Sequence, residues 1–184
     1  MDQSDQPSKS SSEATVTHPN SHTPPTFPEG DISEILGLLE LLKAKSGRAD
    51  IYKLAQELKM EFGDTLTVIR GAELLGLVHT PGGDVVLEPL GVSVSKAKIV
   101  ERKEILADQI AKIPSVQKLC DFLNDQPDKE VSRQEVFEKL AELHPNEDVE
   151  ESFETLVEWG RFAELFGFDE DLDAFYLDDE DESE

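Results

Sequence analysis

The sequence has one cysteine, few basic residues and no long apolar run, and each of these absences excludes a class of protein. Cys120 alone cannot form an internal disulfide or supply a Cys-rich zinc site. No apolar run approaches the roughly 18–20 residues of a membrane span. Residues 1–28 lack the basic and apolar stretches of a signal peptide. We therefore expect a soluble, cytoplasmic protein that does not insert into a membrane.

Positive charge is scarce and unevenly placed. The chain has 184 residues, of which 17 are Lys or Arg and 41 are Asp or Glu, so its formal net charge is −24. Residues 128–184 alone hold 22 acidic and 4 basic side chains. A nucleic-acid duplex or an anionic membrane surface would be repelled by most faces of such a molecule.

Composition separates a folded centre from two polar ends. Residues 1–30 hold almost no large apolar side chain before Phe27, so we expect this segment to be disordered. Residues 178–184 form an acidic tail, which should repel itself. We expect a first folded unit over 31–95. A connecting helix and a second unit should occupy 96–177.

The first unit shows three helical patterns followed by a hairpin. Apolar residues recur at helical spacing over 32–42, 51–58 and 66–75, and Asp31 with Glu34 has the spacing of a capping box. Gly47 and Gly76 should end the first and third helices. A Gly-Gly turn then separates the short apolar runs 77–78 and 85–87, which is typical of a β-hairpin. Three helices and a hairpin predict a winged-helix unit.

The same plan recurs in the second half. A connecting helix should bury Ile99, Leu106, Ile110 and Ile113 before Pro114 interrupts it. Helical patterns follow over 116–123, over 132–143 from the capping-box pair Ser132 and Glu135, and over 149–160. Gly160 should end the last of these, and 166–168 with 175–177 should pair as a hairpin. The predicted fold is mainly α with short β-hairpins, arranged as tandem winged-helix-like units.

Catalytic and metal motifs are weak in this sequence. Asp169, Asp171, Asp173 and Glu180 have the spacing of a calcium loop, but Ala174 stands where that loop needs glycine, so an acidic hairpin turn is favoured. Cys120 lies on an apolar helix stripe, which predicts a small core residue. No phosphate-binding G-x-x-x-x-G-K-[ST] motif occurs. We expect no enzymatic activity, no catalytic or metal-binding residue and no cofactor.

DNA binding is the first alternative for a winged helix. The third helix would enter the major groove and would need basic or amide side chains. The first unit offers Asp64, Thr65, Arg70 and Glu73, while the second offers almost only acids. Reading DNA through the first unit therefore stays the second hypothesis, and nucleic acid is disfavoured as a partner.

Two features are candidates for binding a protein partner. Lys96, Lys98, Arg102 and Lys103 form the basic cluster of the chain, which is either a solvated helix face or a contact for an acidic partner. Trp159 belongs to an aromatic set before the second hairpin, which is either core or interface. Its neighbour Arg161 adds a positive charge.

Five ordered stretches resemble a known family. They read RADIYKLA at 48–55, AELLGL at 72–77, PLG at 89–91, ERK at 101–103 and EWGRFAELF at 158–166. They are similar to the AAA-associated C-terminal domain that follows the ATPase in ATP-binding subunits of nitrate/sulfonate/bicarbonate-type ABC importers. The resemblance implies a regulatory, non-catalytic domain, here without the ATPase, and in it Arg102 and Arg161 could pair with acids to fix how the units pack. We expect a regulatory or adaptor module that binds such an importer's ATPase, with no ATP binding of its own.

Overall fold

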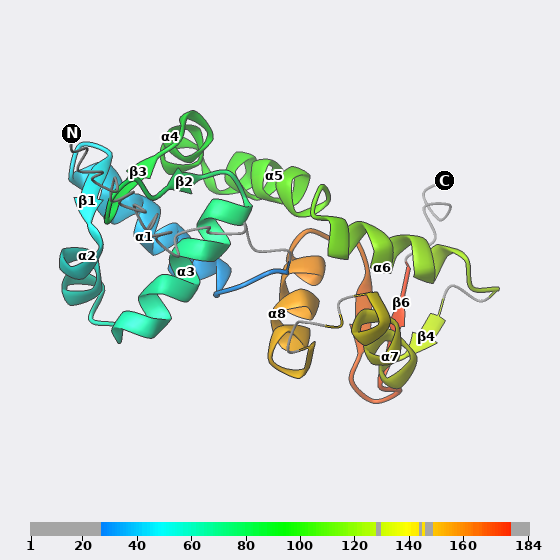
Figure 1. Ribbon diagram of the computed structural model, residues 1–184. Coiled ribbons are helices and arrows are strands. Elements are labelled where there is room, and N and C mark those ends of the chain that lie inside the picture. Colours follow the sequence, from blue (N-terminus) through cyan, green and yellow to red (C-terminus); the bar gives the residue numbers. More distant parts are fainter. Residues whose placement is uncertain (1–26, 128–129, 144, 146–148, 178–184) are drawn as a thin grey trace, which may run out of the picture.

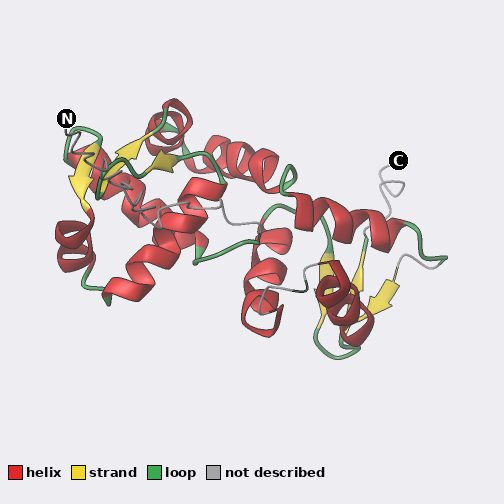
Figure 2. Cartoon of the chain, viewed as in Figure 1, coloured by secondary structure: helices red, strands yellow, loops and turns green. Residues whose placement is uncertain are grey.

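The chain forms an elongated molecule of two helical units joined along one side. The computed structural model describes residues 27–127, 130–143, 145 and 149–177, and within these it contains eight helices and six strands. Figures 1 and 2 show the first unit at one end, the second at the other, and α5 (Ile99–Ile110) running between them. The expected disordered segment falls mostly outside the described residues, and the acidic tail lies entirely outside them.

The first unit contains three helices and a small sheet. Its helices are α1 (Ile32–Ala44), α2 (Ile51–Leu58) and α3 (Phe62–Leu74), and its strands are β1 (Arg48–Asp50), β2 (Val78–His79) and β3 (Asp84–Leu87). The strands pair antiparallel in the order β1-β3-β2. Asp31 begins α1 by accepting hydrogen bonds from the main-chain N–H groups of Ser33 and Glu34, at 2.6 and 3.1 Å. Gly47, at φ +88°, ends the turn after α1.

The second unit repeats the order of the first. It consists of α6 (Pro114–Asn124), β4 (Glu130–Ser132), α7 (Arg133–Leu143), α8 (Val149–Phe162), β5 (Gly167–Asp169) and β6 (Ala174–Tyr176). Its sheet has the equivalent antiparallel order, β4-β6-β5. The mainly helical class with short hairpins is therefore confirmed, and the repeated order of elements is compatible with tandem winged-helix-like units.

Several details differ from the sequence prediction. Each sheet has a third strand, β1 or β4, that was not predicted. Helix α4 (Pro89–Lys96) was also not predicted, because Pro89 suggested a stop although proline is well suited to the first turn of a helix, as Pro114 shows in α6.

Gly160 does not end α8. The helix continues to Phe162, and the left-handed residue that follows it is Glu164, at φ +56°. A Cβ atom on Gly160 would lie 1.9 Å from the ring of Phe166. The glycine is needed there because the ring packs directly on the α8 backbone.

One continuous apolar core runs through both units. It includes Leu38 and Leu39 of α1, Leu106 of α5, and Phe153 and Trp159 of α8, all almost fully buried. Helix α4 packs on α1, and α5 packs on both α4 and α8. Because α5 contacts elements of both halves, it fixes the two units relative to each other.

Candidate partner-binding surface

An exposed apolar pair lies where α4 meets α5. Ile99 is 86% exposed and Val100 is 70% exposed, although both belong to the first turn of a helix. The lysines at positions 96 and 98 are exposed beside them. We call the residues Lys96, Lys98, Ile99 and Val100 the α4–α5 corner.

The exposure of Ile99 corrects the predicted core stripe of the connecting helix. Leu106 and Ile110 of that stripe are fully buried, and Ile113 is almost so. The side chains one turn after Ile99, at i+3 and i+4, are Arg102 and Lys103, so the stripe has no apolar member there. This gap is the sequence signal that could have identified Ile99 as a surface residue.

Two of the four predicted basic residues have partners within the molecule. Arg102 donates from Nη2 to Glu40 Oε1 of α1 at 2.9 Å, and from Nε to the carbonyl of Val94 in α4 at 3.2 Å. Lys103 forms an ion pair with Glu164, which follows α8. Arg102 thus fixes α5 on the first unit, and Lys103 joins α5 to the second unit.

The other two basic residues remain available. Neither Lys96 nor Lys98 forms an ion pair or side-chain hydrogen bond with any residue that the structure describes. Both are exposed and lie next to the apolar pair. The predicted basic cluster therefore divides into a structural half, Arg102 and Lys103, and an exposed half that belongs to the α4–α5 corner.

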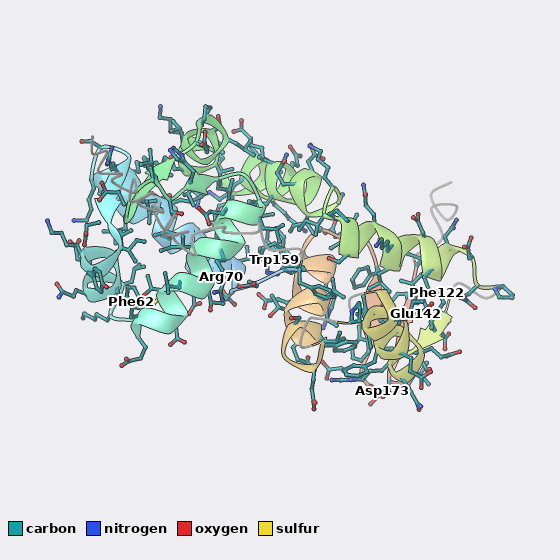
Figure 3. All side chains as sticks on the ribbon, in the orientation of Figure 1. Phe62, Arg70, Phe122, Glu142, Trp159 and Asp173 are labelled. Atoms are coloured by element: carbon teal, nitrogen blue, oxygen red, sulfur yellow. The ribbon has the colours of Figure 1, made fainter. Side chains whose placement is uncertain are left out.

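Trp159 lies in the core, which is the first of the two alternatives that its sequence left open, so it is not a partner-binding residue. Its side chain is 0% exposed, and its indole Nε1–H donates to the carbonyl oxygen of Gly30 at 2.9 Å. Figure 3 shows Trp159 where the two units meet. A buried indole has no surface to offer another protein, so this residue serves to hold α8 against the segment that precedes α1.

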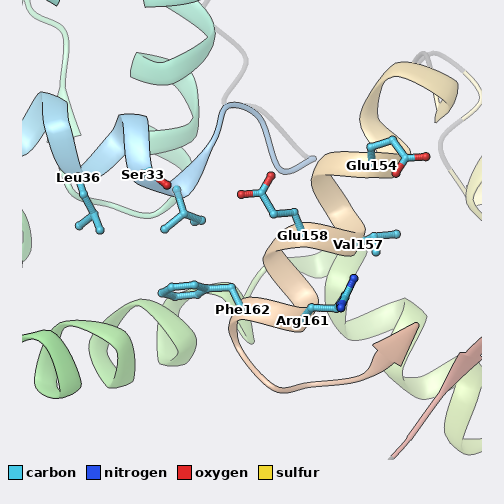
Figure 4. A pocket seen from close by; sticks show the side chains of 8 residues that line it. Ser33, Leu36, Glu154, Val157, Glu158, Arg161 and Phe162 are labelled. Carbon is cyan, nitrogen blue, oxygen red and sulfur yellow. The ribbon is translucent and has the colours of Figure 1, made fainter. Parts of the chain in front are cut away.

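Arg161 lies at the edge of an open cleft between α1 and α8. The cleft has a volume of about 790 Å³ and is lined by Ile32, Ser33, Leu36, Glu154, Val157, Glu158, Arg161 and Phe162. Figure 4 shows Glu158 pointing from α8 toward the start of α1, with Arg161 turned away from it. Arg161 is exposed and forms no ion pair with a described residue, so the predicted packing role through an acid is not seen there.

Two carboxyl groups, those of Asp31 and Glu158, lie close together beside this cleft. Partial burial, together with the charge of Asp31, raises the pKa of Glu158. Partial burial opposes the ionisation of Asp31, yet hydrogen bonds from Ser33 and Glu34 leave the pKa of that carboxyl below its ordinary value. The start of α1 is therefore capped by an ionised Asp31 with a more weakly acidic Glu158 beside it.

The faces that a winged helix would present to DNA carry little positive charge. Arg70 is the one basic residue of α3, and its Nε lies 2.5 Å from Glu29 Oε2 in an ion pair. On α8, Glu154 and Glu158 are exposed, and Glu154 pairs with Arg133 of α7. Glu147 and Asp148, two of the acids that precede α8 in sequence, lie outside the described residues.

The remaining candidates for chemistry have structural roles. Asp169 accepts hydrogen bonds from the N–H groups of Asp171 and Leu172, at 2.8 and 2.9 Å, and so shapes the predicted hairpin turn. Glu180, the last member of the calcium-like spacing, lies outside the described residues. Cys120 packs against the core, and burial, with a smaller effect of Asp121, raises the pKa of its thiol.

Two further features concern the described part of the chain. No group of three or more His, Cys, Asp or Glu side chains there is placed to hold a metal ion. None of the helices in that part is both long and apolar enough to cross a bilayer.

By its fold, this is a mainly helical protein with two small antiparallel sheets. Comparison with known proteins identifies its family. Residues 52–169, from α2 to the end of β5, match the C-terminal AAA-associated domain. Because the match covers well over half of the chain, this protein belongs to that family, as its sequence motifs predicted. No curated protein and no solved structure matches the chain.

Proposed function

We propose that this protein is a non-enzymatic, cytoplasmic regulatory or adaptor module that binds the ATP-binding subunit of an ABC importer of the nitrate/sulfonate/bicarbonate type. Membership of the AAA-associated family supports a link to an ATPase. The observation that carries the binding role is the α4–α5 corner, where two exposed aliphatic side chains directly follow two exposed lysines. Contiguous exposed apolar surface bordered by polar residues is one mark of a protein interaction site.

The structural roles of the described groups with shifted pKa values support the non-enzymatic part of the proposal. The acidic residues with shifted pKa values are Asp31 and Glu158 at the start of α1 and Glu135 in the capping box of α7, and the single thiol is partly buried with a raised pKa. A nucleophilic cysteine would need its pKa lowered instead. The protein therefore acts by binding, and any effect on transport is exerted through the ATPase.

Affinity capture from the source cell tests this function. The full-length chain, tagged at either end, should recover an importer's ATP-binding subunit that a tagged, unrelated acidic protein does not recover. Recovery of other proteins without any transporter subunit would contradict the importer link. A gel-shift assay in low salt tests the alternative: tight duplex binding that weakens steeply with salt would instead favour a transcription regulator acting through the first unit.

A further inference from the structure

We propose that the α4–α5 corner is the docking surface for the partner, and that it receives an acidic segment with an apolar side chain at its centre. This inference rests on the proposed function and adds to it the surface used and the chemistry of the partner. It is derived from the exposure, charge and rigidity of four residues.

The apolar pair supplies the first argument. Among the described residues, six large hydrophobic side chains are exposed: Tyr52, Phe62, Ile99, Val100, Leu172 and Tyr176. Tyr52 and Phe62 stack on each other with ring centroids 4.7 Å apart, so each already has an apolar neighbour. Ile99 and Val100 are adjacent in sequence and are more exposed, at 86% and 70%. Together they form an apolar contact point that a partner can cover.

Charge selects the kind of partner. Lys96 and Lys98 lie just before the pair and have no acidic partner among the described residues, although the chain as a whole carries a net charge of −24. Complementary charge speeds association and orients it. An extended anionic surface such as a membrane would also face the many acids nearby and be repelled, whereas a short acidic segment would contact mainly the corner. The structure therefore favours a protein segment over a lipid surface.

The corner is also held in one conformation. Lys43 of α1 donates to the carbonyl of Ser95 at 2.6 Å, just before the corner. Arg102, just after it, binds Glu40 and the carbonyl of Val94. Because both flanks are fixed to α1 or α4, the backbone loses little conformational freedom on binding, which favours affinity.

Calorimetric titration with purified importer ATP-binding subunits of the source organism tests the surface. The double variant I99S/V100S should bind at least about tenfold more weakly than the wild type, since burial of even one aliphatic side chain contributes roughly that factor. The charge reversal K96E/K98E should also weaken binding about tenfold and reduce its salt dependence. All four side chains are exposed, so the variants should fold, and circular dichroism checks that they do.

Matched controls distinguish the corner from general surface effects. L172S removes an aliphatic side chain that is 66% exposed on the β5–β6 turn, and K112E/K118E makes the same change of net charge on exposed lysines elsewhere. Both should bind within about twofold of the wild type.

Each of the other outcomes contradicts either the docking proposal or the proposed function. If the wild type binds and I99S/V100S binds equally well, the surface is wrong while the proposed function stands. If no subunit binds the wild type, the proposed function falls and the docking proposal falls with it. Binding to phosphatidylserine vesicles that depends on Ile99 and Val100, with subunit binding unaffected, would replace the acidic segment by a lipid surface.

Discussion

At the scale of single residues, the Trp-Gly-Arg stretch of α8 does three different things. Trp159 is buried and bonded to Gly30, Gly160 leaves room for the ring of Phe166, and Arg161 is exposed at the α1–α8 cleft. Sequence analysis singled out all three but could not separate their roles. The separation depends on Gly30 and on Phe166, and neither contact can be deduced from helical spacing.

Replacing Trp159 by phenylalanine should destabilise the protein by about 1–3 kcal/mol. The variant keeps most of the apolar bulk but removes the indole donor, which leaves the Gly30 carbonyl without its partner. Urea unfolding followed by circular dichroism measures the change. Y176F, which alters an aromatic residue that is 38% exposed, should change the free energy of unfolding by less than about 0.5 kcal/mol. Equal stability of W159F and wild type would contradict the role assigned to the indole.

Because Glu158 lies next to Asp31, we expect the substitution E158Q to raise the thermal stability of the protein in a pH-dependent way. The pKa of Glu158 is raised in the folded state, so its protonated form is favoured there, and the associated stability is lost as the pH rises through that pKa. Above that pKa both carboxyl groups are ionised, and E158Q removes their repulsion while keeping an oxygen acceptor. The melting temperature of E158Q should therefore exceed that of the wild type at pH 7.

The difference in melting temperature between E158Q and the wild type should disappear below the ordinary glutamate pKa of about 4.3, where Glu158 is protonated in both the folded and the unfolded state. E104Q, which changes an exposed acid on α5, is the control for the loss of one negative charge. If E104Q raises the melting temperature by the same amount, or if the increase in E158Q persists at low pH, the contact with Asp31 is not the cause of the increase.

At the scale of elements, the parts of the fold that could be predicted are those encoded locally. Apolar spacing identified seven of the eight helices that the structure describes, and turn residues identified both hairpins. Strands β1 and β4 were missed because each has only three residues, and their pairing with β3 and β6 joins segments 34 to 46 residues apart. Similarly, the basic cluster was evident from sequence, but its division depends on Glu40 and Glu164, each about sixty residues away.

The capping box before α7 gives a prediction at this scale. The Ser132 N–H donates to Glu135 Oε2 at 3.2 Å, and the Glu135 N–H donates to Ser132 Oγ at 3.3 Å, so the two residues bond reciprocally. S132A should cost about 1 kcal/mol of stability. Hydrogen bonds from Ser132 also lower the pKa of Glu135, so NMR titration of S132A should show that pKa moving upward.

S93A is the matched control for this substitution. The Ser93 hydroxyl donates only to the carbonyl of Pro89 within its own helix, so its loss should change stability by less than about 0.5 kcal/mol. An unchanged pKa of Glu135 in S132A would show that the capping box does not form in solution.

At the scale of the whole molecule, charge repulsion and the apolar core have opposite effects on the stability of the fold. The net charge of −24 disfavours the compact state, while one apolar core extends through both units. Raising the ionic strength from about 0.01 to 0.15 M shortens the Debye length from about 30 to 8 Å, so the melting temperature should rise. Differential scanning calorimetry measures this, and a fall in melting temperature would mean that attractive ion pairs outweigh the repulsion.

Hydrogen exchange of the full-length chain, with and without a purified importer ATP-binding subunit, tests most directly that the protein acts by docking this ATPase at the α4–α5 corner. Main-chain amides over 98–103 should exchange more slowly in the complex, while those of α3 should be unchanged. Protection confined to α3, or no protection anywhere at saturating subunit, would contradict the account.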